Sequence, residues 1–186
     1  MKIKRLLILA SMALVGFSAC TKDSDDDNST TPQQFPQELL IDGTRYELGE
    51  GFVLSYGQAS FYQGTNLDLN VVTSGISVSF DASGFPDTAT GSGYIFYLEM
   101  YSPDSTFISP GTYTIDTAGS GNLFTISSGA TFTYGVANEL EYGFINGSVE
   151  VTRLDGVSTF VGTFTEQGGK EVKFSYQKTL AVIDDN

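Results

Sequence analysis

The chain has 186 residues, of which 22 are acidic and nine are basic, so its net charge is −13 at neutral pH. This excess of negative charge argues against nucleic acid as a partner, because phosphate backbones are neutralised by clusters of Lys and Arg. The sequence has no His and one Cys, which removes the commonest general base, the commonest metal ligand and any intrachain disulfide. We therefore expect no cofactor and no metal site, and we expect packing alone to stabilise the fold.

Residues 1–19 have the organisation of a secretion signal. A basic start precedes an apolar run, residues 6–17, that is too short to span a bilayer, and small residues stand just before Cys20. This pattern resembles the lipobox of bacterial lipoproteins, with Phe17 in the position where Leu is usual. The resemblance implies that Cys20 carries acyl chains such as palmitate and becomes the first residue of the mature chain.

Residues 20–36 (CTKDSDDDNSTTPQQFP) are predicted to form a disordered tether. Acidic, Ser, Thr and Pro residues dominate the segment, so it buries too little apolar surface to offset its ordering entropy. Its acidic run does not match a calcium-binding EF-hand loop, which needs Gly at position six and Glu at position twelve. Counted from Asp23, those positions hold Asn28 and Gln34.

The start of this tether also has the composition of a localisation signal. Residues 21–27 (TKDSDDD) resemble the Lys-then-acidic export signal of Bacteroidota surface lipoproteins. The resemblance implies a lipid-anchored protein on the outer membrane that faces the medium. The alternative is the inner leaflet of the outer membrane, with the segment serving as a solvated spacer.

Residues 37–186 are predicted to form one all-β domain. Asp42-Gly43 is a strong hairpin signal between two short apolar runs, residues 82–93 are expected to be a loop, and Gly93–Tyr101 is the most apolar strand and is expected to be central. No segment of the mature chain shows helical spacing. The expected strands are 37–41, 44–48, 51–57, 66–72, 76–81, 93–101, 112–116, 122–127, 147–154, 157–165 and 170–181.

The last three of these strands are joined by two-residue turns at 155–156 and 168–169, so they are predicted to form a meander with one solvated face. Eight to eleven antiparallel strands in one chain favour a single antiparallel β-sandwich or a flattened β-barrel, because both limit exposed strand edges.

Three short motifs resemble a broad group of small Bacteroidota surface lipoproteins with β-rich domains. They are residues 40–46 (LIDGTRY), 109–113 (SPGTY) and 145–151 (INGSVEV). The resemblance implies a β-sandwich or barrel domain at the cell envelope and adds little about activity.

Four carboxylates are candidates for catalysis, because a glycoside hydrolase needs only two. Glu139 and Glu141 would share one face of a strand, and Glu99 and Asp68 lie between apolar neighbours, where burial could raise a pKa. We expect all four to lie in solvent, Glu139 and Glu141 on an edge and the others on a wet face. The chain also lacks a nucleophile elbow and a phosphate-binding loop, so an enzyme is not expected.

Aromatic residues in or beside loops and strand ends are the candidate binding residues. On a rigid domain they could stack on a sugar ring or anchor a protein partner, although the absence of Trp weakens the sugar hypothesis. Alternatively, they seal the edges of the core, or the domain holds a small ligand in an apolar cavity. These residues are Tyr46, Tyr56, Phe61, Tyr62, Tyr134 and Tyr142.

The sequence therefore predicts a lipid-anchored, non-catalytic binding or accessory domain whose partners are the membrane, through Cys20, and a protein or a glycan. Two alternatives remain at this point. One is a small carboxylate-dependent enzyme that acts on surface polysaccharide, and the other is a structural subunit that exchanges a strand.

Overall fold

The computed structural model describes residues 35–184, which belong to one compact unit, Gln34–Asn186. The predictions for the signal peptide, for Cys20 and for nearly all of the tether lie outside the described residues.

The described part of the chain is all-β, which confirms the predicted fold class. Its twelve strands are β1 (Glu38–Ile41), β2 (Thr44–Gly57), β3 (Thr65–Thr73), β4 (Ile76–Phe80), β5 (Pro86–Gly91), β6 (Gly93–Ser102), β7 (Gly111–Ile115), β8 (Thr125–Tyr134), β9 (Glu141–Leu154), β10 (Val157–Glu166), β11 (Glu171–Lys178) and β12 (Val182–Asp184).

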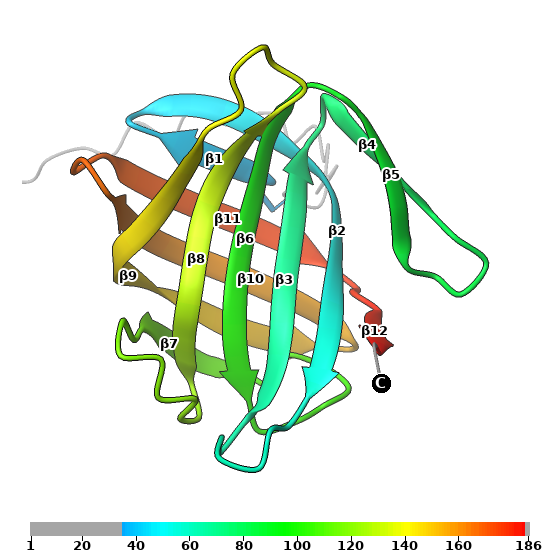
Figure 1. Ribbon diagram of the computed structural model, residues 1–186, viewed down its shortest axis with the longest axis vertical. Coiled ribbons are helices and arrows are strands. Elements are labelled where there is room, and N and C mark those ends of the chain that lie inside the picture. The colour runs from blue at the N-terminus through cyan, green and yellow to red at the C-terminus, as the bar shows by residue number, and fades with distance from the viewer. Residues whose placement is uncertain (1–34, 185–186) are drawn as a thin grey trace, which may run out of the picture. The chain divides into compact units, whose positions relative to one another are not determined.

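Nine of these strands close into a flattened barrel in the order β1-β11-β10-β9-β7-β8-β6-β3-β2, and β2 pairs back to β1. Figure 1 shows two walls: β8, β6, β3 and the lower half of β2 run upright in front, and β9, β10, β11 and β1 cross behind them at an angle. We call these the front wall and the back wall. The short β12 adds to the lower half of β2 in parallel, and β4 and β5 form a separate hairpin that projects from the upper end.

Two long strands carry the chain around the corners between the walls. In β2, residues 44–47 pair with β1, and residues 48–57 pair with β3, with a register shift between Leu48 and Gly51. Gly51 has no room for a side chain, because a Cβ there would lie 2.6 Å from the Tyr176 hydroxyl. In β9, Gly147 has a φ of 138°, next to the register shift against β10. Glycines at bulges let one strand bend from one wall into the other.

The interior is filled by aromatic side chains from both walls. The rings of Phe96 on β6 and Phe174 on β11 stack with centroids 3.9 Å apart, and those of Phe144 and Phe164 stack at 4.7 Å. Phe96 also lies 5.7 Å from both Phe144 and Phe164, so the four rings form one cluster. All four side chains are buried. Among residues 35–184, a core packed in this way fills the space between the two walls with side chains.

Several details differ from the sequence-based prediction: the strand expected at 147–154 is β9, which begins at Glu141, and β7 pairs with β8 in parallel. The expected strands 44–48 and 51–57 form one bent strand, and the expected loop 82–93 contains β5. The strand expected at 122–127 is β8, which runs to Tyr134, and β12 was not predicted. By contrast, Gly93–Tyr101 does lie inside the front wall, between β3 and β8, and the meander of β9, β10 and β11 is present.

Replacing Phe96 by Ala should lower the free energy of unfolding by about 3–5 kcal/mol, because the change removes the ring that the other three contact. Urea unfolding at pH 7 measures this loss. Val161→Ala is the matched control, since that side chain is 50% exposed on the back wall and should change stability by less than about 0.5 kcal/mol. Equal losses in the two variants would contradict a wall-to-wall aromatic core.

Candidate functional site

The outer face of the front wall is more buried than an ordinary wet face. On β3, inward Leu67 and Leu69 are fully buried, yet the outward Asp68 is also only 8% exposed. On the back wall, by contrast, the outward Val161 and Lys173 are exposed. A strand that is buried on both faces of a small barrel indicates that other groups cover its outer side. The outer side of the front wall is therefore covered around Asp68.

A groove crosses the upper part of this outer face. Its first hollow, of about 240 Å³, lies between the β4–β5 hairpin and the front wall. The wall contributes Phe52, Val72 and Ile95, and the hairpin contributes Val78 and Pro86. Most of this lining is apolar, and Asn70, Asp87 and Thr88 add polar groups.

The second hollow, of about 280 Å³, shares Ile95 with the first and extends to the β8–β9 loop. Its lining includes Phe132, Tyr134, Leu140 and two carboxylates, Glu139 and Glu141. Tyr134 also fixes the hairpin, because its hydroxyl donates a 2.6 Å hydrogen bond to the Ala89 carbonyl. We call the two hollows together the outer-face groove.

Lower on the same face, Asp68 of β3 lies directly opposite Glu99 of β6. Asp68 Oδ2 accepts a 3.0 Å hydrogen bond from the Tyr97 hydroxyl. Glu99 Oε1 accepts hydrogen bonds from Asn66 Nδ2 at 2.9 Å and from the Tyr101 hydroxyl at 3.3 Å. Burial raises the pKa of Asp68 to about 7; the Tyr97 hydrogen bond opposes this rise, and the charge of Glu99 adds to it.

This pair corrects one expectation. Asp68 and Glu99 do point outward, but Asp68 is buried, so the prediction that it lies on a wet face is wrong. The physical reason is the cover that Tyr97 and its neighbours give to this part of the front wall. Glu139 and Glu141, in contrast, are exposed as expected.

The six aromatic residues singled out from the sequence do not form one site. Tyr46, Tyr134 and Tyr142 lie toward the upper end of the barrel, and Tyr56, Phe61 and Tyr62 lie toward the lower end. Of the six, only Tyr134 lines the outer-face groove.

The two other upper residues lie around the mouth of the barrel. Tyr46 packs on Tyr94 of β6 with ring centroids 4.6 Å apart, and both rings contact the core. The Lys170 amine lies 5.4 Å from the centre of the Tyr142 ring. Below them, the Thr131 hydroxyl donates a 2.6 Å hydrogen bond to the buried Glu166. These contacts fill the upper mouth.

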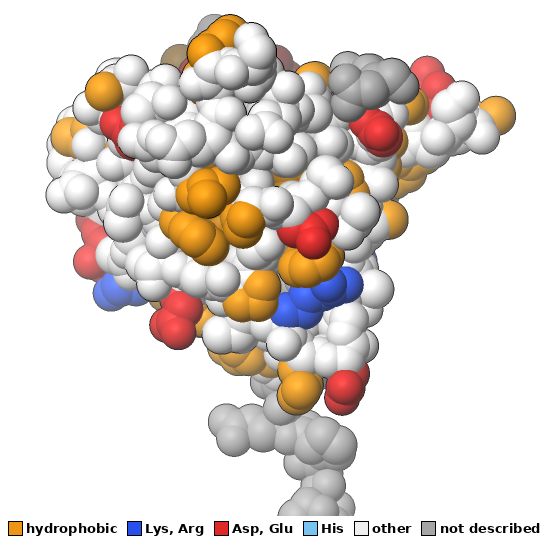
Figure 2. All heavy atoms as spheres, turned by 90° about the horizontal axis from the view of Figure 1, so that it is seen from below, with side chains coloured by type: hydrophobic (Ala, Val, Ile, Leu, Met, Phe, Trp, Pro, Cys, Tyr) orange, Lys and Arg blue, Asp and Glu red, His pale blue; other side chains and the backbone are white. Residues whose placement is uncertain are grey.

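At the lower end, Tyr62 packs against Tyr101 at 4.8 Å and Phe61 packs against Tyr62 at 4.3 Å. Phe61 remains 75% exposed, and Leu154, the last residue of β9, is 76% exposed. Figure 2 looks at this end and shows hydrophobic side chains near its centre, with acidic and basic side chains beside them. The lower aromatics thus seal strand connections and leave an apolar surface.

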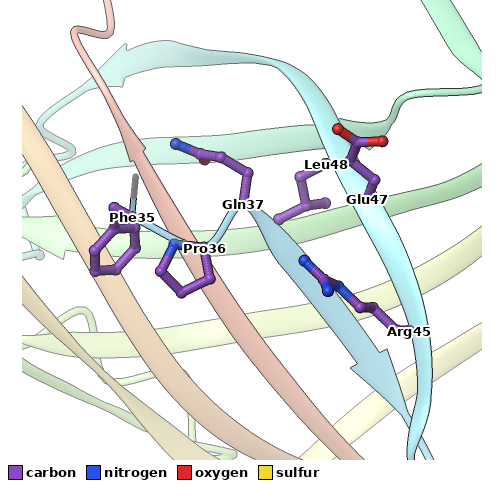
Figure 3. A pocket seen from close by; sticks show the side chains of 6 residues that line it. All are labelled: Phe35, Pro36, Gln37, Arg45, Glu47 and Leu48. Carbon is purple, nitrogen blue, oxygen red and sulfur yellow. The ribbon is translucent and has the colours of Figure 1, made fainter. Parts of the chain in front are cut away.

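Another hollow, of about 360 Å³, lies beside β1 and the upper half of β2 (Figure 3). Phe35, Pro36 and Gln37 line one side, and Arg45 and Glu47 of β2 line the other. Arg45 forms a 2.9 Å ion pair with Glu38. Although Phe35, Pro36 and Leu48 border it, the exposed surface of this hollow is mostly polar, so the more apolar outer-face groove is the better candidate.

The groove could not be predicted from the sequence, because residues 82–93 have the Gly, Pro, Asp and Ser composition of a loop. Pro86 and the Asp-Thr-Ala-Thr sequence after it have weak strand character, whereas β4 has the expected alternation. The pairing of β5 with β4 is what creates the wall of the first hollow.

Comparison with protein-family models, with curated proteins and with solved structures found no match. Within residues 35–184 there is no helix with the length and apolar character needed to cross a bilayer. In the same range, no three His, Cys, Asp or Glu side chains are grouped as they would be around a metal ion.

The burial of Asp68 should make stability depend on pH. The folded chain retains the Asp68 proton up to about pH 7, whereas the unfolded chain loses it near pH 3.8, so stability should fall as pH rises between these values. In a buffer free of divalent cations, Asp68→Asn should therefore be about 1–3 kcal/mol more stable than the unmodified chain at pH 8, and similar to it at pH 4. Urea unfolding from pH 4 to pH 8 measures the difference.

The control is Glu150→Gln, which removes one charge at an exposed back-wall position. It should leave the pH dependence unchanged. A constant difference between Asp68→Asn and the unmodified chain at all pH values would show that Asp68 titrates normally.

Proposed function

We propose that this chain is a lipid-anchored binding domain of the outer membrane, exposed at the cell surface and without catalytic activity of its own. The lipobox pattern that ends at Cys20 supports the lipid anchor, and the acidic segment after it supports export to the cell surface. The outer-face groove supports the binding role. It is a concave surface that combines an apolar floor with a polar rim, the usual composition of a ligand site.

The lining of the groove favours a neutral glycan as its ligand. Phe52, Phe132 and Tyr134 offer ring faces or edges on which sugar rings could pack. The carboxylates of Glu139 and Glu141 at the rim can accept hydrogen bonds from hydroxyl groups and would repel an anionic ligand. A stable protein partner would need a contact patch of about 800 Å² on each side, whereas the groove offers two bounded hollows.

Phe132→Ala should weaken glycan binding about tenfold, because it removes a ring from the groove floor. The measurement is calorimetric titration of the purified chain with a panel of neutral oligosaccharides, with Val161→Ala as the control for loss of an exposed apolar group. If a glycan binds and Phe132→Ala binds it as tightly as the control, the groove is not the site. If no glycan binds, a protein partner becomes the better hypothesis.

The same panel tests the enzymatic alternative, which one observation favours. Asp68 and Glu99 are neighbouring carboxylates, and a raised pKa on one member is the pattern of an acid paired with a base. Against this, Asp68 is 8% exposed, so a polysaccharide has little access to it. Turnover of a glycan that is lost in Glu99→Gln would replace the binding proposal with catalysis.

The anchor has its own test. Cys20→Ser removes the thiol that would be acylated, so the variant should leave the membrane fraction, and its intact mass should show no acyl adduct. Several acyl chains hold a protein far more firmly than one, at about 0.8 kcal/mol per buried CH₂, so the shift should be nearly complete. A variant that still fractionates with membranes like the unmodified chain would contradict lipid anchoring at this position.

A further inference from the structure

The buried side-chain oxygens without a hydrogen-bond partner gather around Glu99. Among residues 35–184 these oxygens are Asn66 Oδ1, Asp68 Oδ1 and Ser127 Oγ. Asp68 lies opposite Glu99 in the sheet, and Asn66 lies opposite Tyr101, the next outward residue of β6. Ser127 is the extra residue of β8 at the bulge where the register shifts after Glu99. Strands on both sides of β6 therefore supply the three oxygens.

The hydrogen-bond donors around Asp68 and Glu99 leave some of the carboxylate oxygens without a partner. Tyr97 satisfies one oxygen of Asp68, and Asn66 and Tyr101 both donate to the same oxygen of Glu99. Asp68, at 8% exposure, still has a carboxylate oxygen with neither solvent nor a donor.

Such an arrangement is unfavourable as it stands. Like charges directly opposite each other in a sheet are destabilising, and a buried acceptor without a partner has lost the hydrogen bonds that water would give it. A proton on Asp68 would relieve the repulsion but would supply only one donor. A divalent cation would neutralise both carboxylates and could contact several oxygens at once.

We propose that Asn66, Asp68 and Glu99 bind a calcium ion on the outer face of the front wall, with Ser127 as an additional oxygen beside them. The donors are all oxygens, which suits a hard cation, and they combine carboxylate, amide and hydroxyl types. Calcium accepts six to eight such ligands in flexible geometry, with water completing the set, whereas magnesium requires a near-ideal octahedron. Two carboxylates give a modest ligand charge, so a dissociation constant of about 10⁻⁴ to 10⁻³ M is expected.

The ion would lie just below the outer-face groove. Asn70 of β3 lines the groove, and its side chain donates a 3.3 Å hydrogen bond to the Asp68 carbonyl. Tyr97, which contacts Asp68, also packs edge-on against Phe132 of the groove floor at 6.3 Å. Calcium would therefore stiffen the strands that carry the groove, and this proposal does not depend on what the groove binds.

The test is calcium binding to the purified chain after treatment with a chelator and its removal. At pH 7.5, calcium chloride at 5 mM should raise the midpoint of thermal unfolding by several degrees, and calorimetric titration should give one site per chain. Asp68→Asn and Glu99→Gln should each weaken calcium binding at least tenfold. Glu150→Gln, which removes the same charge from the back wall, should bind calcium like the unmodified chain.

The measurement on the unmodified chain is decisive even if a variant fails to fold. No heat of binding and no rise in the unfolding midpoint with calcium would overturn the proposal and leave a proton on Asp68 as the occupant. Equal weakening in Glu150→Gln would mean that calcium responds only to net charge, which also overturns it. Equal effects of magnesium and calcium at the same concentration would contradict the assignment to calcium.

Discussion

The stack of Phe96 on Phe174 joins the front wall to the back wall, and the arrangement of the rest of the barrel depends on it. With centroids 3.9 Å apart and an interplanar angle of 6°, the two rings set how closely the walls approach. Phe144 and Phe164 extend the same cluster toward the β9 corner. No disulfide can add to this, because the chain has one Cys. Burial of large rings is thus the main source of cohesion.

Because side chains fill the interior of the barrel, we expect a ligand site on its outer surface. Many small barrels hold ligands between their walls, but here that space holds phenylalanine rings, and the upper mouth is filled by Tyr46 and Tyr94 and by the Glu166–Thr131 contact. The outer face of the front wall, in contrast, is partly covered by other groups. The β4–β5 hairpin shapes the groove above, and Asp68 and Glu99 form a buried polar cluster below.

Much of the fold could be predicted because it follows from alternation along single strands. Phe96, Leu98 and Met100 share a face by period, and the turns at 155–156 and 168–169 define the meander by their residue types. The bent strand β2 could not be recognised in the same way. Gly49 and Gly51 predict an interruption between two strands. In the structure they lie at a bulge, where a single strand bends from one wall into the other.

The candidate site was harder to predict, because it depends on contacts between distant segments. The sequence identifies Asp68 and Glu99 as carboxylates in apolar strands, but their pairing depends on the register between β3 and β6, which no local pattern specifies. The groove depends on the hairpin that β5 completes, and β5 has a sequence typical of a loop. Tyr134, a binding residue predicted from the sequence, lines the groove, and its hydroxyl is held by a hydrogen bond to the Ala89 carbonyl.

The most direct test of an outward-facing site is to map a bound ligand by NMR. Backbone amide shifts of the isotopically labelled chain would be followed during titration with the oligosaccharide that binds most tightly. Our account predicts that the shifts concentrate at outward positions of the front wall and at the hairpin, including Phe52, Ile95, Phe132 and Ala89. Shifts confined to the barrel mouth around Tyr46, Tyr94 and Tyr142, with the outer face unchanged, would contradict it.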